Sequence, residues 1–371
     1  MTLARTRLTT PGFTLAAVSL AAFLAAFLVG PPAVLFSAML LALLLVGAVV
    51  TIRGLPPLEA RVTLPDVVGW GTAFPSALEL GAVDGRERPA ARDVIISLAL
   101  RDQSPRPVAI LPQTSVDLTM RPTLRMFERG RVRSWRLVVE SSWPFGLLTR
   151  SVEADGTADL LVLPRIGRVR GFETLLRRAD RRHVVRRRPT KGDEDLKALR
   201  DWREGDSRRR IHWKISARRG RDVLRELEEP NETSVHLVFD ARTGTARRRR
   251  PTVSFERAVR LTASLIESFR KSGRPWAFTV LDDEGATPVP SRGRRGSRLA
   301  LEVLAEVQAV PGGVSSPLPV PARGRHELLV LVCAGRPSGE ERLAESPDLV
   351  LDIESDETRT WLRDSCGWSE E

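Results

Sequence analysis

Two long runs without a charged residue stand near the start of the chain. They cover residues 13–29 and 33–52, and Gly30-Pro31-Pro32 separates them. A helix needs about 20 apolar residues to cross a bilayer, with roughly 17 as the lower bound. Because Pro ends one helix and can open the next, the pattern predicts a transmembrane helical hairpin over residues 1–54. A secretory signal would explain the first run, but its removal would leave a second span just downstream.

Basic residues at both outer ends of the hairpin indicate its orientation. Arg5 and Arg7 precede the first run, Arg53 and Arg61 follow the second, and the connecting turn carries no charge. Lys and Arg accumulate on the cytoplasmic side of membrane spans. We therefore expect two spans in the cell (inner or plasma) membrane, with both termini and the bulk of the chain in the cytoplasm.

Residues 55–164 consist of short strand-like runs. The clearest are residues 93–100, 131–140 and 159–163, which are β-branched or aromatic and are bounded by Pro, Gly, Asp and Ser. No apolar stripe at a 3.6-residue period appears among them, so strands are favoured over helices. Several short strands at this spacing are typical of a β-sandwich. The pattern predicts such a sandwich, with a turn at residues 142–147.

From residue 230 to 371 strand and helix patterns alternate. Continuous apolar runs predict strands at 234–240, 276–281, 327–333 and 349–353, and other segments predict helices at 299–310, 339–344 and 357–364. A further helix has an apolar face formed by Phe255, Ala258, Val259, Thr262, Leu265, Ile266 and Phe269. This alternation predicts a multi-domain chain ending in an α/β, doubly wound, mainly parallel sheet. Ligands of such sheets bind beyond the carboxyl ends of the strands, where Asp240, Asp282 and Asp283 lie.

Composition changes this picture mainly in the remaining segment, residues 165–229. The whole chain has a formal charge of +12, and this segment, with 22 Lys and Arg against 12 Asp and Glu, carries +10. Three residues at helical spacing predict a helix that ends at Gly205: Leu196, Leu199 and Trp202. Three apolar residues that alternate with polar ones predict a strand after it: Ile211, Trp213 and Ile215. Its acidic and basic side chains are dense enough to pair with one another.

Thirteen residues of this basic segment form a motif, which we call the signature. They are Leu199, Arg200, Trp202, Gly205, Asp206, Arg210, Ile211, His212, Trp213, Lys214, Ser216, Ala217 and Arg218. The motif resembles that of the bacterial family called domain of unknown function 58, and Pro144-Phe145-Gly146-Leu147 resembles an upstream element of the same family. The resemblance implies a membrane hairpin, a β-rich region and a final domain like the von Willebrand factor A domain. It also implies two partners, a MoxR-type AAA+ ATPase and a transglutaminase-like membrane protein, but no known reaction.

The von Willebrand factor A resemblance raises the question of a metal site. Such domains often carry D-x-S-x-S after the first strand, which supplies hard oxygen ligands for Mg²⁺. Here the aspartate stands as Asp240, but Arg242 and Gly244 replace the two serines. Because an Arg repels a dication and can pair with the carboxylate, we expect a degenerate adhesion site without a metal. The alternative to a ligand role is that Arg242 or a nearby backbone N–H satisfies Asp240.

Other functional classes leave weaker marks in the sequence. Two Cys and four scattered His are too few for a disulfide scaffold or a metal site built from these residues. No G-x-S-x-G, H-E-x-x-H or phosphate-binding loop is present, so a hydrolase using Asp206 and His212 stays a minor alternative. The Arg-rich segment is a plausible footprint for nucleic acid or an anionic membrane. We disfavour nucleic acid because twelve acids interrupt the basic residues and because Trp202 and Trp213 fall on apolar faces.

The sequence therefore predicts a membrane-anchored, non-enzymatic scaffold or adaptor. Its expected parts are the hairpin (1–54), the β-sandwich (55–164), the basic signature segment (165–229) and the α/β domain (230–371). The expected role is docking of a MoxR-type ATPase in cell-envelope assembly or in a chaperone-like process, without a cofactor. The pattern leaves open whether the signature is a docking site or only stabilises the fold.

Overall fold

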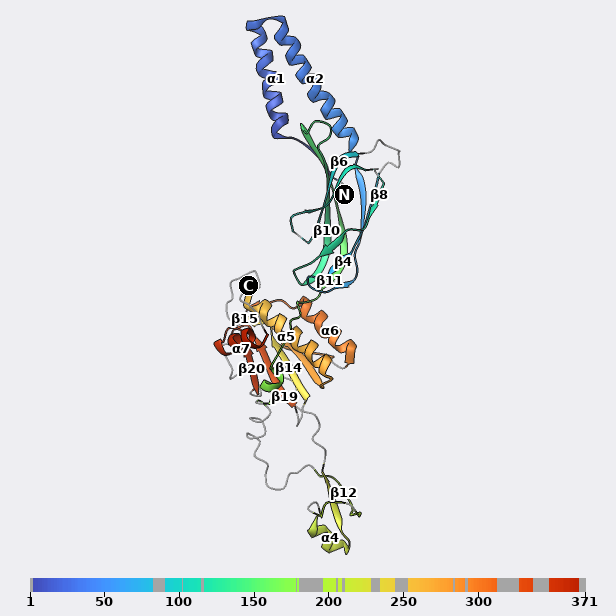
Figure 1. Ribbon diagram of the computed structural model, residues 1–371, viewed down its shortest axis with the longest axis vertical. Helices are drawn as coiled ribbons and strands as arrows, with labels where there is room; N and C mark the ends of the chain where they lie inside the picture. Colours follow the sequence, from blue (N-terminus) through green and yellow to red (C-terminus); the bar gives the residue numbers. More distant parts are fainter. Residues whose placement is uncertain are drawn as a thin grey trace. The chain divides into compact units, whose positions relative to one another are not determined.

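The computed structural model describes most of the chain and divides into two compact units. The described residues are 3–82, 91–101, 103–114, 117–177, 179, 196–204, 206–208, 211–227, 234–243, 253–282, 284–290, 293–311, 327–335 and 347–366. The first unit is Met1–Leu163 and the second is Pro164–Glu371. Figure 1 shows the elements of each unit.

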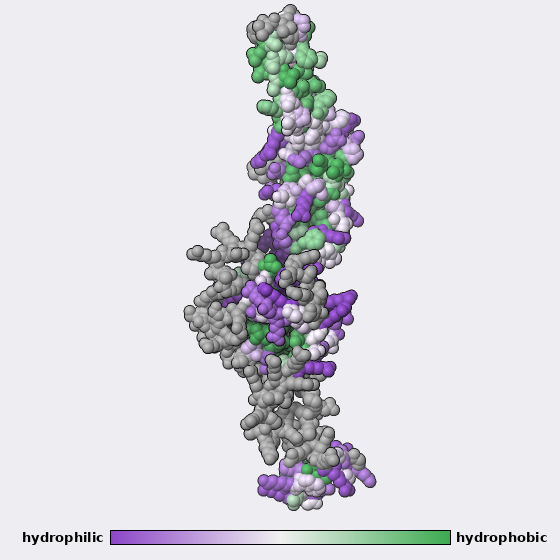
Figure 2. Space-filling view, turned by 60° about the vertical axis from the view of Figure 1, so that its left-hand side comes forward, coloured by the Kyte–Doolittle hydropathy of each residue, from purple (hydrophilic) through white to green (hydrophobic). Residues whose placement is uncertain are grey.

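Two consecutive apolar helices begin the first unit. Helix α1 spans Thr10–Val29 and helix α2 spans Pro31–Gly54, with Gly30 between them at φ 91° and Pro31 in the first turn of α2. The break lies where the sequence predicts it, because only Gly adopts this φ without strain. Ser19 Oγ of α1 donates to Ser37 O of α2 at 3.1 Å, so the helices pack together. Their outer surface is apolar (Figure 2).

One of these helices meets the length and composition of a membrane span in the part of the chain that the structure describes. This is Val34–Gly54 within α2, whereas the apolar stretch of α1 that qualifies is the shorter Thr10–Ala25. A strand that the sequence did not predict, β1 at Leu3–Leu8, precedes α1. The basic residues Arg5 and Arg7 therefore lie on a strand at the foot of the helices.

The rest of the first unit is built from β-sheets, as the sequence predicts. The larger sheet has the order β1-β11-β10-β6-β7, with β3 added parallel to β11, and the smaller sheets are β2-β5-β8 and β4-β9. The strands are β2 Leu58–Thr63, β3 Val67–Val68, β4 Ala73–Pro75, β5 Ala77–Ala82, β6 Ala91–Leu100, β7 Arg106–Thr114, β8 Leu118–Met120, β9 Thr123–Arg125, β10 Gly130–Ser141 and β11 Leu148–Val162.

One apolar core joins the larger sheet to the smaller ones. It includes Leu78 and Leu80 of β5 together with Ile96 of β6 and Leu137 of β10, all buried. Alternate residues of each strand reach this core because successive side chains point to opposite faces of a sheet. Sharing a core between sheets is how a β-sandwich is stabilised, so the packing agrees with the predicted class.

A mainly parallel sheet forms the centre of the second unit. Its order is β17-β16-β14-β19-β20, and only β17, paired with β16, is antiparallel. The strands are β14 Ser234–Asp240, β16 Trp276–Leu281, β17 Ala286–Val289, β19 Glu327–Cys333 and β20 Leu349–Asp352, and the helices are α5 Val253–Ser272, α6 Gly293–Glu306 and α7 Asp356–Cys366. A short parallel pair, β15 Arg242–Thr243 and β18 Val310–Pro311, stands beside it.

Most sequence predictions for this sheet are confirmed. The predicted apolar face of α5 is buried at every position that the sequence named, from Phe255 to Phe269. Helix α6 begins six residues before the predicted start at Leu299 and ends at Glu306, because its first turns are rich in Gly, Arg and Ser rather than apolar residues. Strand β17 was not predicted, and the helix expected at 339–344 lies outside the described residues.

The start of the basic segment packs on the same sheet-and-helix domain. Phe172 is buried between Phe269 of α5 and Trp361 of α7, with ring centroids 5.7 and 6.3 Å away. Gly167 N donates to Ser264 Oγ at 2.8 Å, and Arg274 pairs with Glu173 at 2.8 Å. Residues 167–173 are therefore an integral part of the α/β fold.

The signature folds differently from the prediction. Leu196–Asp201 is strand β12, not a helix, and Trp213–Arg219 is helix α4, not a strand. Strand β12 pairs antiparallel with β13, Val223–Leu227, which lies more than 20 residues further along the chain. Local periodicity does not report such long-range pairing, so spacing over six residues favoured the wrong element. Helix α4 ends at Gly220, which has the left-handed φ of 63° that favours Gly.

Candidate functional site

The signature is organised around a clasp between Arg200 and Asp206. Arg200, at the end of β12, places its two terminal nitrogens 2.6 and 2.7 Å from the two carboxylate oxygens of Asp206. Arg203 N also donates to Asp206 Oδ2 at 2.9 Å. Paired N–H···O bonds of this kind are among the strongest in proteins and fix direction as well as distance. The clasp therefore holds the loop after β12 in one conformation.

A second set of bonds closes the same loop. Trp202 Nε1 donates to Asp206 O at 3.1 Å, and Trp202 N donates to Asp222 O at 2.8 Å. A terminal nitrogen of Arg221 donates to Asp201 Oδ2 at 3.0 Å. The predicted pairing of acids with Arg is thus confirmed at two sites. Two signature residues, Gly205 and Arg210, lie outside the described residues.

These hydrogen bonds change the pKa of Asp206. The Arg200 guanidinium, with the Arg203 backbone N–H, lowers the pKa of Asp206 to about 2. Hydrogen bonds to the ionised form of a carboxyl stabilise that form and oppose its protonation. Asp206 is consequently an anion that neutralises Arg200 across the physiological range, and neither group is left to bind an external charge.

We expect the clasp to resist acid more than an ordinary aspartate does. A carboxyl with a lowered folded-state pKa contributes stability above its unfolded pKa of about 3.9, and loses that contribution as the pH falls toward 2. Hydrogen exchange of the β12 amides in the full chain, corrected for intrinsic rates, should therefore stay slow at pH 4 and accelerate below pH 3. Asp206→Asn should remove this pH dependence; an unchanged acid profile in that variant would contradict the assignment.

Buried residues anchor α4 to β13. Ile211 is buried and forms a bridge with Leu224, and His212 N donates to Val223 O at 2.8 Å. Val223 N in turn donates to Ser216 Oγ at 2.9 Å, and both residues are buried. A buried N–H needs such an acceptor, because leaving it unsatisfied costs about 1–3 kcal/mol. These signature residues therefore stabilise the local fold.

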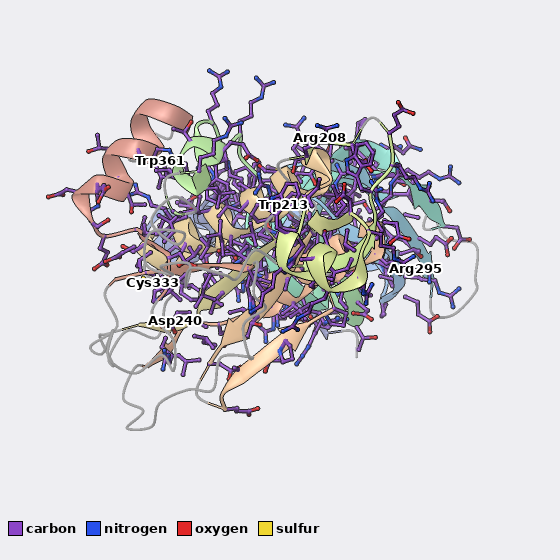
Figure 3. All side chains as sticks on the ribbon, turned by 90° about the horizontal axis from the view of Figure 1, so that it is seen from below. Arg208, Trp213, Asp240, Arg295, Cys333 and Trp361 are labelled. Atoms are coloured by element: carbon purple, nitrogen blue, oxygen red, sulfur yellow. The ribbon has the colours of Figure 1, made fainter. Side chains whose placement is uncertain are left out.

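The opposite face of α4 is exposed. Trp213, Lys214, Ala217 and Arg218 lie within about 140° of one another around the helix and are all exposed. The exposed fraction of Trp213 is 65%, so the prediction that this Trp falls on a buried face is wrong. Figure 3 shows Trp213 at α4, with Arg208 labelled in the same part of the signature. Within the part of the chain that the structure describes, Lys214 and Arg218 form no ion pair.

Charge around this face is strongly positive. Residues 196–227 contain eleven Lys and Arg against five Asp and Glu, a formal charge of +6. Asp206 and Asp201 are already held by Arg200 and Arg221, so these two acids do not screen Lys214 or Arg218 by direct contact. Trp213 is thus exposed beside Lys214 and Arg218, which form no ion pair within the described residues. We call Trp213, Lys214, Ala217 and Arg218 the α4 face.

The side chains considered for the alternative hydrolase function form no hydrogen bonds with one another among the described contacts. Asp206 is held in the clasp, and Ser216, a nearby hydroxyl, accepts a hydrogen bond from Val223 N at its Oγ. His212 Nδ1 is buried and has no hydrogen-bond partner among the described residues. A catalytic relay requires its nucleophile, base and orienting group within about 2.6–3.2 Å of one another. The described geometry supplies no such relay.

At the carboxyl edge of the parallel sheet, Asp240 meets Arg242. Arg242 Nε and a terminal nitrogen lie 2.7 and 2.9 Å from the two carboxylate oxygens, and Arg242 N donates at 3.1 Å. Asp240 is buried, and its carboxylate raises the pKa of the Arg242 guanidinium. This is the pairing that the sequence offered as the alternative to a metal ligand. Gly244 lies outside the described residues.

Two further Asp residues at strand ends accept hydrogen bonds from backbone N–H groups. Asp352, which the sequence did not single out, accepts hydrogen bonds from Gly335 N at 3.0 Å and Glu354 N at 2.9 Å. Figure 3 shows Asp240 close to Cys333 at the same edge of the sheet. Asp282 accepts from the amides of Glu284 and Gly285 in a turn. No group of three His, Cys, Asp or Glu able to hold a metal occurs among the described residues. An Asp at the end of a strand was the available signal for Asp352.

Comparison with known families agrees with the position of the signature. Residues 198–324 match the family described as "Protein of unknown function DUF58". The match begins one residue before Leu199, covers the whole signature and extends through α6, about a third of the chain. It supports the resemblance that the motif residues suggested, for this portion of the sequence.

Comparisons with curated proteins and with solved structures give no further information on function. No curated protein matches the chain. Among solved structures, the chain is similar to the solution structure of the CARDB domain of a Pyrococcus furiosus protein, at 10% identity over 29% of this chain and 94% of that domain, with a TM-score of 0.18. A likeness at this level carries no argument about function.

Proposed function

We propose that the protein is a membrane-anchored, non-enzymatic adaptor whose α4 face docks an acidic surface of a protein partner. The observation that carries the proposal is the exposure of Trp213 on the same helix face as Lys214 and Arg218, while the remaining described signature contacts are internal. Trp and Arg are enriched among the residues that contribute most to protein–protein binding. In this proposal the internal contacts of the signature stabilise its fold, and the α4 face is the surface that binds the partner.

The anchor in this proposal is the α1–α2 hairpin. The stretch Val34–Gly54 meets the length of a span, and both helices expose large apolar side chains, including Phe13 at 70% and Leu35 at 73%. We propose that α1 is the second span and that Arg5, Arg7 and Arg53 keep both helix ends in the cytoplasm. The adaptor would then present α4 in the cytoplasm, where a soluble ATPase can reach it.

The proposed partner is the MoxR-type AAA+ ATPase that the family resemblance implies, with a transglutaminase-like membrane protein as a further member. A cell-envelope or chaperone-like role would follow from that partnership. We also propose that the parallel sheet of the second unit corresponds to the von Willebrand factor A-like domain. Its strand-end Asp240 would be structural rather than metal-binding, since Arg242 contacts both of its oxygens.

Nucleic acid is the second candidate, and one observation favours it. Exposed Trp213 offers a ring on which a base can stack, next to cations that can contact phosphate. A protein partner is preferred because the exposed ring is a single one on a short helix. Single-strand binders use several aromatic rings along a groove.

The test compares Lys214→Ala/Arg218→Ala with the parent, using the detergent-solubilised full chain and a purified MoxR-type ATPase. Loss of two exposed cations should raise the dissociation constant roughly tenfold and flatten its dependence on salt. The matched control is Arg294→Ala/Arg295→Ala, which removes the same charge from exposed positions of α6. Equal affinities in all three proteins would refute the docking face. Steeply salt-dependent retention of DNA in place of the ATPase would favour the second candidate.

A further inference from the structure

The turn between β10 and β11 packs against the lower ends of both apolar helices. Residues 143–147, which we call the β10–β11 loop, lie there in Figure 1. Thr9 N donates to Leu147 O at 3.1 Å at the start of α1, and Thr51 Oγ1 of α2 donates to Trp143 O at 2.6 Å. A Cβ added to Gly12 would overlap Leu147 O. The loop and the two helices are therefore in direct, close contact.

Phe145 reaches well along α2. A Cβ built at Gly47 would lie 3.7 Å from the Phe145 ring and 3.9 Å from Leu147 Cδ1. Gly47 stands six residues before Arg53 of α2, which is about 9 Å along the helix axis at 1.5 Å per residue. Phe145 thus lies level with the apolar part of the candidate span, beyond the charged end of the helix. Its exposed fraction is 52%, so much of the ring faces outward.

Several backbone polar groups of the loop form hydrogen bonds within the protein. The Thr9 hydroxyl lies 2.6 Å from Gly146 O and 2.9 Å from Leu147 O, so its one hydrogen is shared between these carbonyls. Gly146 N donates to Ser142 O at 2.9 Å. Pro144 has no N–H to satisfy. Irregular backbone is tolerated at membrane depth only where protein satisfies its polar groups. Thr9 and Thr51, at the helix ends, supply such bonds to the carbonyls of Trp143, Gly146 and Leu147.

Four Arg residues stand on the strands and the helix end next to the loop. Arg92 lies over the Trp143 ring, with its guanidinium carbon 4.9 Å from the ring centroid, and Arg150 Nε donates to Leu55 O at 2.6 Å. Arg53 stands in the last turn of α2, and Arg7 is exposed on β1. A belt of Arg beneath apolar and aromatic side chains matches the headgroup layer of an anionic leaflet.

We propose that the β10–β11 loop enters the cytoplasmic leaflet beside the hairpin, with Phe145 among the acyl chains and the Arg belt at the lipid headgroups. The inference rests on the proposed membrane anchor and adds a third contact between this unit and the bilayer. Together with the loop's bonds to both helices, this contact fixes the β-sheet domain against the membrane. The β-sheet domain would then be held in a fixed position at the membrane surface, rather than linked to it only through the two helices.

Photo-crosslinking tests the inference in the full chain reconstituted into vesicles of phosphatidylcholine and phosphatidylglycerol. p-Benzoylphenylalanine replaces Phe145, Leu45 or Phe127 in turn, and lipid adducts are measured by mass spectrometry. Leu45 is an exposed residue of the candidate span. Phe127 is the matched control: it is 56% exposed on the same unit, but it contacts Trp70 and not the helices.

Lipid adducts at 145 and 45, with none at 127, are the expected result. Adducts at 45 without any at 145 would overturn the loop insertion while leaving the anchor in place. The absence of adducts at 45 would refute the membrane anchor itself, and the loop insertion with it. Equal yields at 145 and 127 would also overturn the inference, because the domain would then meet lipid without regard to the loop.

Discussion

Replacing Trp213 with Ala should raise the dissociation constant for the acidic partner by about 30-fold or more, the equivalent of about 2 kcal/mol. Aromatic residues at the centre of an interface contribute energy of this size when a partner removes them from water. Because Trp213 is 65% exposed, its removal should leave the unfolding midpoint of the free chain almost unchanged. Binding of the solubilised full chain to an immobilised ATPase gives the first quantity, and thermal unfolding the second.

A matched substitution separates docking from general surface hydrophobicity. Leu299→Ala removes another large, exposed apolar side chain, 39% exposed on α6. It should leave the affinity unchanged. If Trp213→Ala and Leu299→Ala bound the partner equally well, the α4 face would not be the docking site.

Arg242→Ala should lower the stability of the second unit by roughly 3–5 kcal/mol, because it leaves the buried carboxylate of Asp240 without its charged partner. For a unit of this size the midpoint of thermal unfolding should fall by roughly 6–20 °C. Among the described residues, the backbone N–H at position 242 would remain as a donor to Asp240. Calorimetry of the full chain measures the change.

The control for this prediction is charge removal at an exposed site. Arg294→Ala should change the midpoint little, since surface charges contribute at most about 1 kcal/mol. Adding Asp240→Asn to Arg242→Ala should recover part of the loss, because a neutral amide tolerates burial better than a carboxylate. A midpoint unchanged by Arg242→Ala would show that the pair does not stabilise the strand end.

Long apolar patterns predicted the fold where local sequence decides it. The two uncharged runs became α1 and α2, and the stripe from Phe255 to Phe269 became the buried face of α5. The strand β14 was likewise visible as a continuous apolar run. Shorter elements were not predictable in this way. Strands β1 and β17 are formed by pairing with β11 and β16, and local periodicity says nothing about such partners.

The signature shows the same limit at the candidate site. The density of opposite charges correctly suggested internal pairing, and Arg200 with Asp206 is the result. The segment was nevertheless predicted with its helix and strand exchanged, and that error placed Trp213 on a buried face. The structure places Trp213 on helix α4, where its ring is exposed. The contacts of Phe145 with α2 were equally invisible, because they join residues about 100 positions apart.

Hydrogen–deuterium exchange of the full chain, with and without the MoxR-type ATPase, tests the central claim most directly. Docking on the α4 face should slow exchange of the amides in residues 211–219, while the amides of β14 and α5 keep their rates. Protection confined to the carboxyl edge of the parallel sheet, with 211–219 unchanged, would contradict the account and leave the signature a purely structural element.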